Sequence, residues 1–166
     1  MKFPICKVCM KSELLCNACA ERVGEQEIKI NEIKMFRRLN KILKKQKSLK
    51  DVEIKRAVGN NTLIIMTRNE DVSKLIGKEG SLVKKLAREL NMPIRIIGEP
   101  SNINDLVNDV LFTVPVMGIN ILYKPEGEIF RVRIPKTHRA RLPVSFSVLA
   151  NISRYMLNEN VDVIFE

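Results

Sequence analysis

The sequence lacks the features that would direct it to a membrane or an export pathway. No apolar run approaches the roughly 20 residues that a membrane helix needs. The start of the chain, Met-Lys-Phe-Pro-Ile-Cys, has no apolar stretch of the kind found in a signal peptide. The apolar fraction of 45% and the charged fraction of 29% are ordinary for a globular chain and argue against general disorder. We therefore expect a soluble, cytoplasmic protein with no membrane partner.

The sequence also lacks a catalytic constellation. It has no Walker loop and no Ser/His/Asp or Cys/His set. Its single histidine, His138, has no obvious nucleophile or carboxylate partner in the sequence, so a surface position explains it better than a catalytic one. We therefore expect that the protein is not an enzyme.

Acidic residues are too few to balance the basic ones. Lysine and arginine total 29 against 19 aspartate and glutamate, which gives a formal net charge of +10. Residues 1–60 hold 15 basic and 7 acidic side chains, whereas residues 101–166 hold 7 of each. Clustered cations release counterions when they bind a phosphate backbone, so the excess favours a polyanionic partner. The C-terminal third contributes little to that charge.

All four cysteines lie in the first 19 residues, as Cys6, Cys9, Cys16 and Cys19 in a C-x2-C-x6-C-x2-C pattern. In a reducing compartment such pairs bind metal more often than they form disulfides. Two C-x2-C turns can complete the sulfur tetrahedron of a closed structural zinc site. We predict a zinc finger with one zinc ion and four cysteine ligands. A four-sulfur iron site is the main alternative, because geometry alone does not separate the two metals.

Residues 27–98 predict one supersecondary unit that combines helices and strands. Apolar spacing, Gly/Asn turns and the Asn91-Met-Pro break give the boundaries of the elements. In order, the expected elements are a long helix over 27–46, strands over 52–58 and 62–67, a short helix capped by Asn69, a helix over 81–90 and a strand over 94–97. The long helix carries Lys34, Arg37, Arg38, Lys41, Lys44 and Lys45, which form either a solvated face or an RNA-contacting strip.

The two short helices meet at Gly77-Lys78-Glu79-Gly80. Glycines at both ends of this turn permit a left-handed backbone and let a sugar-phosphate chain approach closely. The helix that begins at Ser81 offers unpaired amides and its positive end to phosphate. The passage from Val72 to Leu90 resembles the core of a KH domain, and the element order of residues 27–98 resembles the type II KH fold. The resemblance implies single-stranded RNA as a partner, with the loop clamping about four nucleotides.

The RNA-binding residues implied by this resemblance lie in the loop, just before it and on the helix after it. They are Ile76, Gly77, Lys78, Glu79, Gly80, Ser81, Lys84, Lys85 and Arg88. Residues 48–100 contain no Phe, Tyr, Trp or His, so this module lacks the stacking rings on which RRM and many OB-fold surfaces depend. In KH domains, bases lie in a groove beside the loop, and Ile76 matches that position.

The C-terminal part repeats the same order at an offset of 66 residues. The expected elements are a helix over 103–112, strands over 119–123 and 128–134, a helix over 147–158 and a strand over 161–165. Pro143-Val-Ser-Phe146 replaces the G-x-x-G loop, with a proline that has no amide and a bulky phenylalanine. We predict that this degenerate copy has lost the clamp. Its basic residues form either a local patch or scattered solvated charges; they are Arg131, Arg133, Lys136, His138, Arg139 and Arg141.

Such a duplicated pair is similar to the paired KH region of archaeal NusA-like transcription factors. We predict an α+β protein with a four-cysteine zinc finger at 1–24, a type II KH domain at 25–99 and a degenerate KH-like domain without G-x-x-G at 100–166. The resemblance implies single-stranded RNA binding in transcription termination, antitermination or RNA processing. The alternative is a protein-interaction adaptor that docks on RNA polymerase or the ribosome through the zinc finger, with the KH folds as scaffold.

Overall fold

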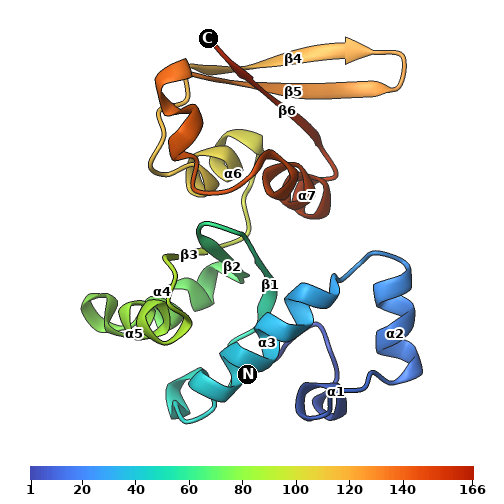
Figure 1. The fold of residues 1–166 in the computed structure, drawn as a ribbon, viewed down its shortest axis with the longest axis vertical. Coiled ribbons are helices and arrows are strands. Elements are labelled where there is room, and N and C mark those ends of the chain that lie inside the picture. The colour runs from blue at the N-terminus through green and yellow to red at the C-terminus, as the bar shows by residue number, and fades with distance from the viewer. The chain divides into compact units, whose positions relative to one another are not determined.

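The computed structural model describes residues 1–166 and divides them into two compact units (Figure 1). The first unit comprises Met1–Val58 and Leu63–Gly98, and the second comprises Gly59–Thr62 and Glu99–Glu166. Each unit combines helices with one three-stranded sheet, which confirms the predicted α+β class. None of the helices has both the length and the apolar composition needed to cross a membrane.

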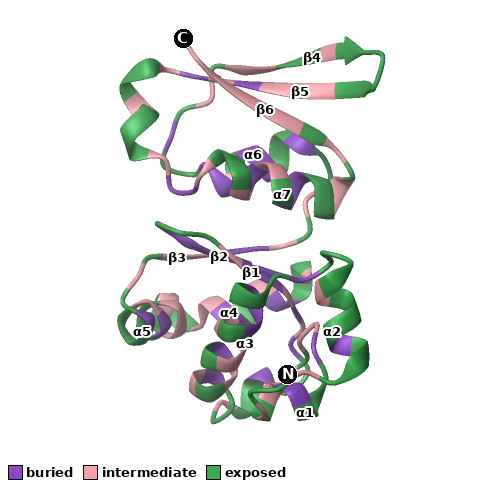
Figure 2. Ribbon diagram, turned by 45° about the vertical axis from the view of Figure 1, so that its right-hand side comes forward, coloured by how far each residue is buried: buried purple, intermediate pink, exposed green.

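The first unit contains five helices and a mixed sheet. Its elements are α1 (Lys7–Lys11), α2 (Asn17–Gly24), α3 (Ile30–Leu43), β1 (Ile54–Val58), β2 (Leu63–Thr67), α4 (Val72–Ile76), α5 (Ser81–Leu90) and β3 (Ile94–Ile97). In the sheet, β2 is central, antiparallel to β1 and parallel to β3. Every residue of β2 is buried, so this strand lies at the centre of the unit (Figure 2).

Helix α3 begins later and ends earlier than the sequence pattern predicts. Its first turn is closed by Glu32, whose carboxylate accepts a hydrogen bond from the backbone N–H of Lys29 at 3.1 Å. The apolar residues Ile33, Phe36 and Leu39 continue from there at helical spacing, and all are buried. The buried stripe, rather than the absence of glycine and proline, therefore sets the length of the helix.

The prediction that Asn69 caps a helix is wrong in detail. Residues Asn69–Asp71 form a 3₁₀ helix, and α4 begins only at Val72. The buried carboxylate of Asp71 accepts hydrogen bonds from the N–H of Glu53 at 3.1 Å, from Arg68 and from Lys74. Burial alone raises the pKa of Asp71, but these donors lower it below its ordinary value, so the ionised carboxylate fixes the entry to α4.

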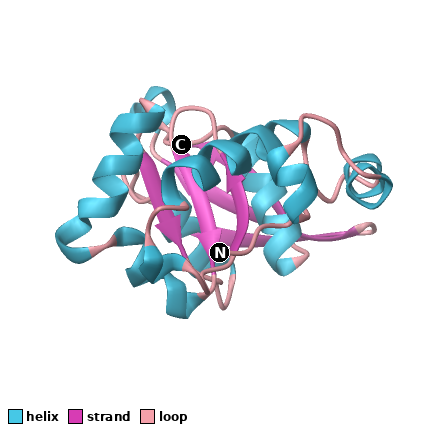
Figure 3. Ribbon diagram, turned by 90° about the horizontal axis from the view of Figure 1, so that it is seen from below, coloured by secondary structure: helices cyan, strands magenta, loops and turns pink.

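The second unit repeats the sheet of the first. Its elements are α6 (Ile103–Val110), β4 (Gly118–Lys124), β5 (Gly127–Ile134), α7 (Phe146–Leu157) and β6 (Asn160–Phe165). Strand β5 is central, antiparallel to β4 and parallel to β6. Strands β4 and β5 are longer than their counterparts β1 and β2. Their hairpin extends past α6 and α7 of the same unit (Figure 1), and Figure 3 draws the strands of both units in magenta.

The second unit differs from the first in the segment between its second and third strands. A 3₁₀ helix over Lys136–Arg141 stands 66 residues after the segment that contains α4. Proline residues at 135 and 143 flank it, and a proline cannot donate a backbone hydrogen bond to extend a helix. This unit therefore has one α-helix, α7, where the first unit has two.

A buried ion pair ties helix α3 to strand β1 in the first unit. Arg56 Nε lies 2.6 Å from Glu32 Oε1, and the second contact, from Arg56 to Glu32 Oε2, measures 2.7 Å. Both side chains are almost fully buried. Because Glu32 also closes the first turn of α3, one carboxylate serves the helix start and the contact between helix and sheet.

We expect Glu32→Gln to lower the free energy of unfolding by about 3–5 kcal/mol, because it leaves the Arg56 guanidinium buried without its counter-charge. The double variant Glu32→Leu/Arg56→Met removes both charges and should recover most of that loss. Urea denaturation followed by circular dichroism measures both. If Glu32→Gln were as stable as the unaltered protein, the stabilising role of the Glu32–Arg56 ion pair would be contradicted.

Candidate functional site

The four cysteine sulfurs gather at one point in the first unit. The Sγ atoms of Cys6, Cys9, Cys16 and Cys19 all lie within 4.8 Å of one another, and all four residues are free of disulfides. The sulfurs of Cys6 and Cys16 are 3.9 Å apart. In tetrahedral coordination with Zn–S bonds of about 2.3 Å, neighbouring sulfurs are a little less than 4 Å apart. The cluster is therefore suited to one zinc ion, as the cysteine spacing predicts.

The local backbone explains why each C-x2-C turn aims two sulfurs inward. Cys6 and Cys16 are the N-caps of α1 and α2, with nearly identical φ/ψ values of −70°/162° and −72°/163°. In each pair the second cysteine lies three residues on, in the first helical turn. The N–H of Cys9 donates to Cys6 Sγ at 3.4 Å, and the N–H of Cys16 donates to Cys9 Sγ at 3.1 Å. The N-terminal ends of two helices therefore stabilise negative charge on the sulfurs.

The cysteine cluster is built into the core of the first unit. Cys9 and Cys19 are buried within it, whereas Cys6 and Cys16 lie at the surface. Arg37 of α3 donates from Nε to the carbonyl oxygen of Cys9 at 3.0 Å. The ring of Phe3 packs against that of Phe36, with centroids 5.7 Å apart. A metal held here organises the surrounding fold, and four protein ligands leave no open position for catalysis.

The thiols differ in acidity because their surroundings differ. The N–H of Cys9 is the largest influence on Cys6 and lowers its pKa to about 7. The N–H of Cys16 lowers the pKa of Cys9, but burial and neighbouring sulfurs outweigh it and raise the pKa to about 12. For Cys19, the Cys6 N–H lowers the pKa, while burial and the Cys16 thiol raise it overall. A bound cation is thus needed to hold all four as thiolates.

We expect protein purified without added metal to contain one equivalent of zinc. Removing it with a chelator should abolish the helicity of α1 and α2 and lower the thermal midpoint, because the segment has few apolar residues of its own. Elemental analysis and circular dichroism measure these effects. Cys19→Ser, which removes a buried ligand, should lose zinc in the same way. One equivalent of iron with a visible absorption band would contradict the choice of metal.

Zinc binding should also depend steeply on pH. At about pH 7 the buried thiols of Cys9 and Cys19 are protonated without metal, so zinc must displace at least two protons. We expect the logarithm of the association constant to rise by about two or more for each unit of pH between about 6 and 7. Competition with a chromogenic chelator measures this slope, and a slope near zero would contradict the four-thiolate site.

The predicted loop lies between α4 and α5, and its backbone has the left-handed geometry that the glycines imply. The φ angles of Gly77, Glu79 and Gly80 are 75°, 52° and 74°. A Cβ at Gly77 would stand 2.8 Å from Leu82 Cβ, whereas one at Gly80 would meet neighbours only at 3.7 Å. Gly77 is therefore required for close packing onto α5, and Gly80 only for its backbone angle.

The predicted RNA-binding side chains are mostly exposed around this loop. Ile76 is partly buried at the end of α4, next to the glycines. Exposed residues are Lys78, Glu79, Ser81, Lys84, Lys85 and Arg88. Lys84 donates from Nζ to the carbonyl oxygen of Glu79 at 3.2 Å, which places its charge on the loop. Lys85 lies 3.8 Å from Glu89 and is partly neutralised. The positive charge nearest the start of α5 thus comes from Lys78 and Lys84.

The corresponding segment of the second unit has a different surface. Pro143 and Val144 are buried, and Phe146 packs its ring against Phe165 with centroids 5.5 Å apart. The guanidinium of Arg139 lies over the same Phe165 ring at 5.5 Å. The segment therefore carries a proline and an aromatic side chain at the positions where the loop of the first unit has its two glycines.

The basic residues of the second unit are partly neutralised. Arg131 pairs with Asp162 at 3.1 Å and Arg133 with Glu166 at 2.6 Å. The Glu166 carboxylate raises the pKa of Arg133. His138 is half-buried, with Nδ1 3.1 Å from the hydroxyl of Thr137. These contacts favour scattered charges over a continuous basic patch.

Comparison with known proteins gives a fold likeness only. No protein-family model and no curated protein matches the chain. A solved structure described as "Crystal structure of APE1850" is similar to 84% of this chain over its own full length, with a TM-score of 0.50 and 16% identity. At that identity the match shows a shared fold and carries no function.

One feature of the first unit is not predicted by the sequence pattern. A pocket of about 460 Å³ lies beside the cysteine cluster and is lined by the first residues of the chain, α1 and Asn40 of α3. The signal in the sequence is the segment Met1-Lys-Phe-Pro-Ile5, in which two large apolar side chains, Phe3 and Ile5, precede the first cysteine. No motif connects that stretch to Asn40; only the folded chain brings them together.

Proposed function

We propose that the protein binds single-stranded RNA through the loop Gly77–Gly80 and that both units are KH-type folds. In support, residues 30–97 follow the order helix, strand, strand, helix, helix, strand, with one antiparallel and one parallel strand pair. The second unit has the same sheet, with a 3₁₀ helix in place of the first short helix. The proposed role is binding rather than catalysis.

The observation that carries this proposal is the construction of the loop. Gly77 packs so closely on the first turn of α5 that no side chain can stand between them. The amide of Ser81 donates to the carbonyl oxygen of Lys78. The amides that follow it in the first turn of α5 can face phosphate oxygens. Lys78 is exposed, and Lys84 is held over the Glu79 carbonyl. Backbone amides and two ammonium groups together suit a sugar-phosphate chain without requiring a sequence.

In this proposal the second unit does not clamp RNA. Its loop position holds Pro143 and Phe146 and lacks the glycines. Residues 101–166 carry no net charge. The partner RNA therefore contacts mainly the first unit, where the positive charge is concentrated. The resemblance to NusA-like factors favours transcription termination, antitermination or RNA processing as the cellular setting.

The second candidate function is a protein adaptor that docks on RNA polymerase or the ribosome. One observation favours it: Val8 and Leu14, in the cysteine-rich segment, are 70% and 80% exposed. Exposed aliphatic side chains on a metal-rigidified segment suit a protein surface. In this alternative the metal-bound segment docks on RNA polymerase or the ribosome, and the KH-type folds serve as a scaffold.

We expect Lys78→Asp to weaken binding of a single-stranded RNA by about tenfold or more, because it replaces a phosphate-pairing charge by a repelling one. Lys78 is exposed, so the fold should not change. The matched control is Lys124→Asp, the same charge change at an exposed site in the second unit. Fluorescence anisotropy at two salt concentrations measures both variants.

The control should bind within about twofold of the unaltered protein. Equal loss in both variants would show that net charge alone governs binding. Unchanged RNA affinity in Lys78→Asp would contradict RNA binding by the loop. Retained binding of that variant to purified RNA polymerase or ribosomes would then favour the adaptor function.

A further inference from the structure

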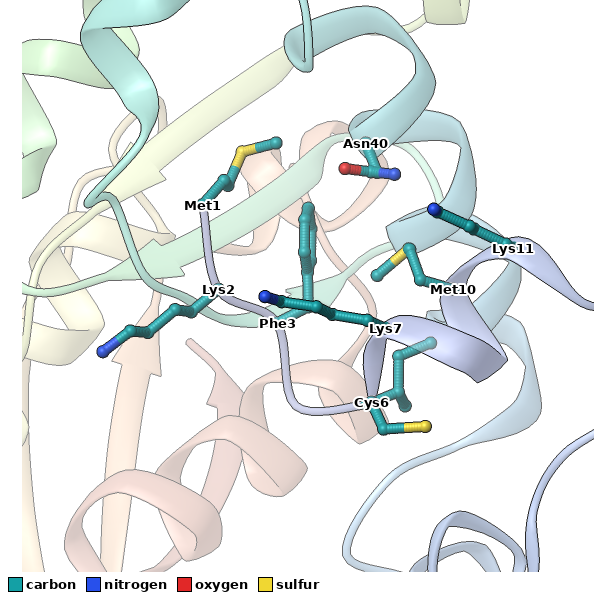
Figure 4. Close-up of a pocket in the computed structure, with 9 residues that line it drawn as sticks. Met1, Lys2, Phe3, Cys6, Lys7, Met10, Lys11 and Asn40 are labelled. Carbon is teal, nitrogen blue, oxygen red and sulfur yellow. The ribbon is translucent and has the colours of Figure 1, made fainter.

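The pocket beside the cysteine cluster combines an apolar floor with a basic rim (Figure 4). Its volume of about 460 Å³ falls in the range of small-ligand sites. The residues that line it come from the start of the chain, from α1 and from α3; they are Met1, Lys2, Phe3, Ile5, Cys6, Lys7, Met10, Lys11 and Asn40. Three of the nine are lysines and none is acidic.

The floor of the pocket offers one aromatic face in a fixed position. In Figure 4 the ring of Phe3 stands between the side chains of Met1 and Met10. Its packing on Phe36, with centroids 5.7 Å apart at 55°, restricts its rotation. Backbone hydrogen bonds hold the segment itself, since the N–H of Lys2 donates to Val52 and the carbonyl of Lys2 accepts from Ile54. The ring is therefore already positioned before a ligand arrives.

The rim of the pocket is positive and carries one amide. Lys2, Lys7 and Lys11 are all exposed. In Figure 4 the side chain of Lys7 passes across the base of Phe3, and the Lys11 ammonium lies on the side of Asn40. The Asn40 amide can both donate and accept a hydrogen bond. An aromatic face, thioether side chains, an amide and unpaired cations match a ligand with a flat ring and a nearby anion.

We propose that this pocket binds one nucleotide of a single-stranded RNA, with its base stacked on Phe3 and its phosphate beside Lys7 and Lys11. The base edge faces the Asn40 amide. The inference rests on the proposed function, since the ligand belongs to the RNA that the loop is proposed to bind. It also supplies what residues 48–100 lack, because no aromatic ring lies near the loop in that part of the sequence.

The metal centre and the pocket share helix α1. Cys6 caps α1 and lines the pocket, and Lys7, Met10 and Lys11 of the pocket all lie on the same helix. Metal bound by Cys6 and Cys9 therefore fixes the wall that carries two of the three rim lysines, Lys7 and Lys11, and one thioether. Removing the metal with a chelator should therefore disrupt the pocket while leaving the loop between α4 and α5 in place.

The direct test uses the zinc-loaded full chain with ¹³C-labelled methionine methyl groups. Stacking of a base on Phe3 shifts the methyl resonances of Met1 and Met10, while Met117 and Met156 of the second unit serve as internal references. The probe is an oligoadenylate of about ten nucleotides, with AMP and polyglutamate as separate arms. We expect the oligoadenylate to shift Met1 and Met10 and the polyglutamate to leave them in place.

Variants give a second, independent measurement. Phe3→Leu should weaken oligoadenylate binding by about fivefold or more, since it removes the stacking face. Lys7→Ala/Lys11→Ala should lower the salt dependence, with the slope of log K against log salt falling by about 1.4. The matched control is Lys47→Ala/Lys124→Ala, which removes two exposed charges outside the pocket, the loop and the basic face of α3. If Phe3→Leu fails to fold, the salt dependence of the Lys7→Ala/Lys11→Ala variant still tests the pocket proposal.

Each outcome separates this inference from the proposed function. If Lys78→Asp weakens binding but the oligoadenylate leaves Met1 and Met10 unshifted, the loop binds RNA and the pocket proposal is overturned. If the methyl resonances of Met1 and Met10 shift and Lys78→Asp does not weaken RNA binding, the pocket proposal stands and RNA binding by the loop is contradicted. Shifts with AMP but not with the oligoadenylate would overturn the RNA assignment in favour of a free nucleotide. Shifts with polyglutamate alone would indicate an acidic protein partner.

Discussion

Four thiolates brought within coordination distance of one metal ion are the constraint on which the first unit depends. Cys9 and Cys19 belong to the same buried cluster as Ile5, Phe36 and Leu39, so metal binding and core packing stabilise each other. Without a cation the raised pKa values of the buried thiols keep them protonated. The helices α1 and α2 are also too short to be stable on their own. The metal thus fixes the direction of α1, and α1 carries the basic residues that border the pocket.

Charge and shape agree on where a polyanion can bind. The first unit holds most of the excess lysine and arginine, the glycine loop and a pocket in which Phe3 is bordered by lysines. In the second unit Arg131 and Arg133 are paired with acids, and Phe146, which packs on Phe165, stands at the position of the second loop glycine. The two units therefore share one sheet topology but carry different surfaces, and the proposed phosphate contacts lie on the first unit.

The cysteine spacing and the local patterns could be predicted from the sequence because each depends on neighbouring residues. The metal ligands, the strand over 94–97 and the offset between the units follow from spacing alone. The start of α4 could not be predicted in this way, because the buried Asp71 accepts a hydrogen bond from the backbone N–H of Glu53, which is 18 residues away in the sequence. The pocket was missed for the same reason: Phe3 and Asn40 are distant in sequence and meet only through the fold.

The central claim is that RNA lies on the first unit, at the glycine loop and the pocket. Photocrosslinking of a 4-thiouridine-substituted single-stranded RNA to the zinc-loaded protein, followed by mass spectrometry of the modified peptides, tests it most directly. The account predicts crosslinks in peptides that contain Phe3–Lys11 and Ile76–Arg88. Crosslinks confined to residues 101–166, or none at RNA concentrations that saturate binding, would contradict it.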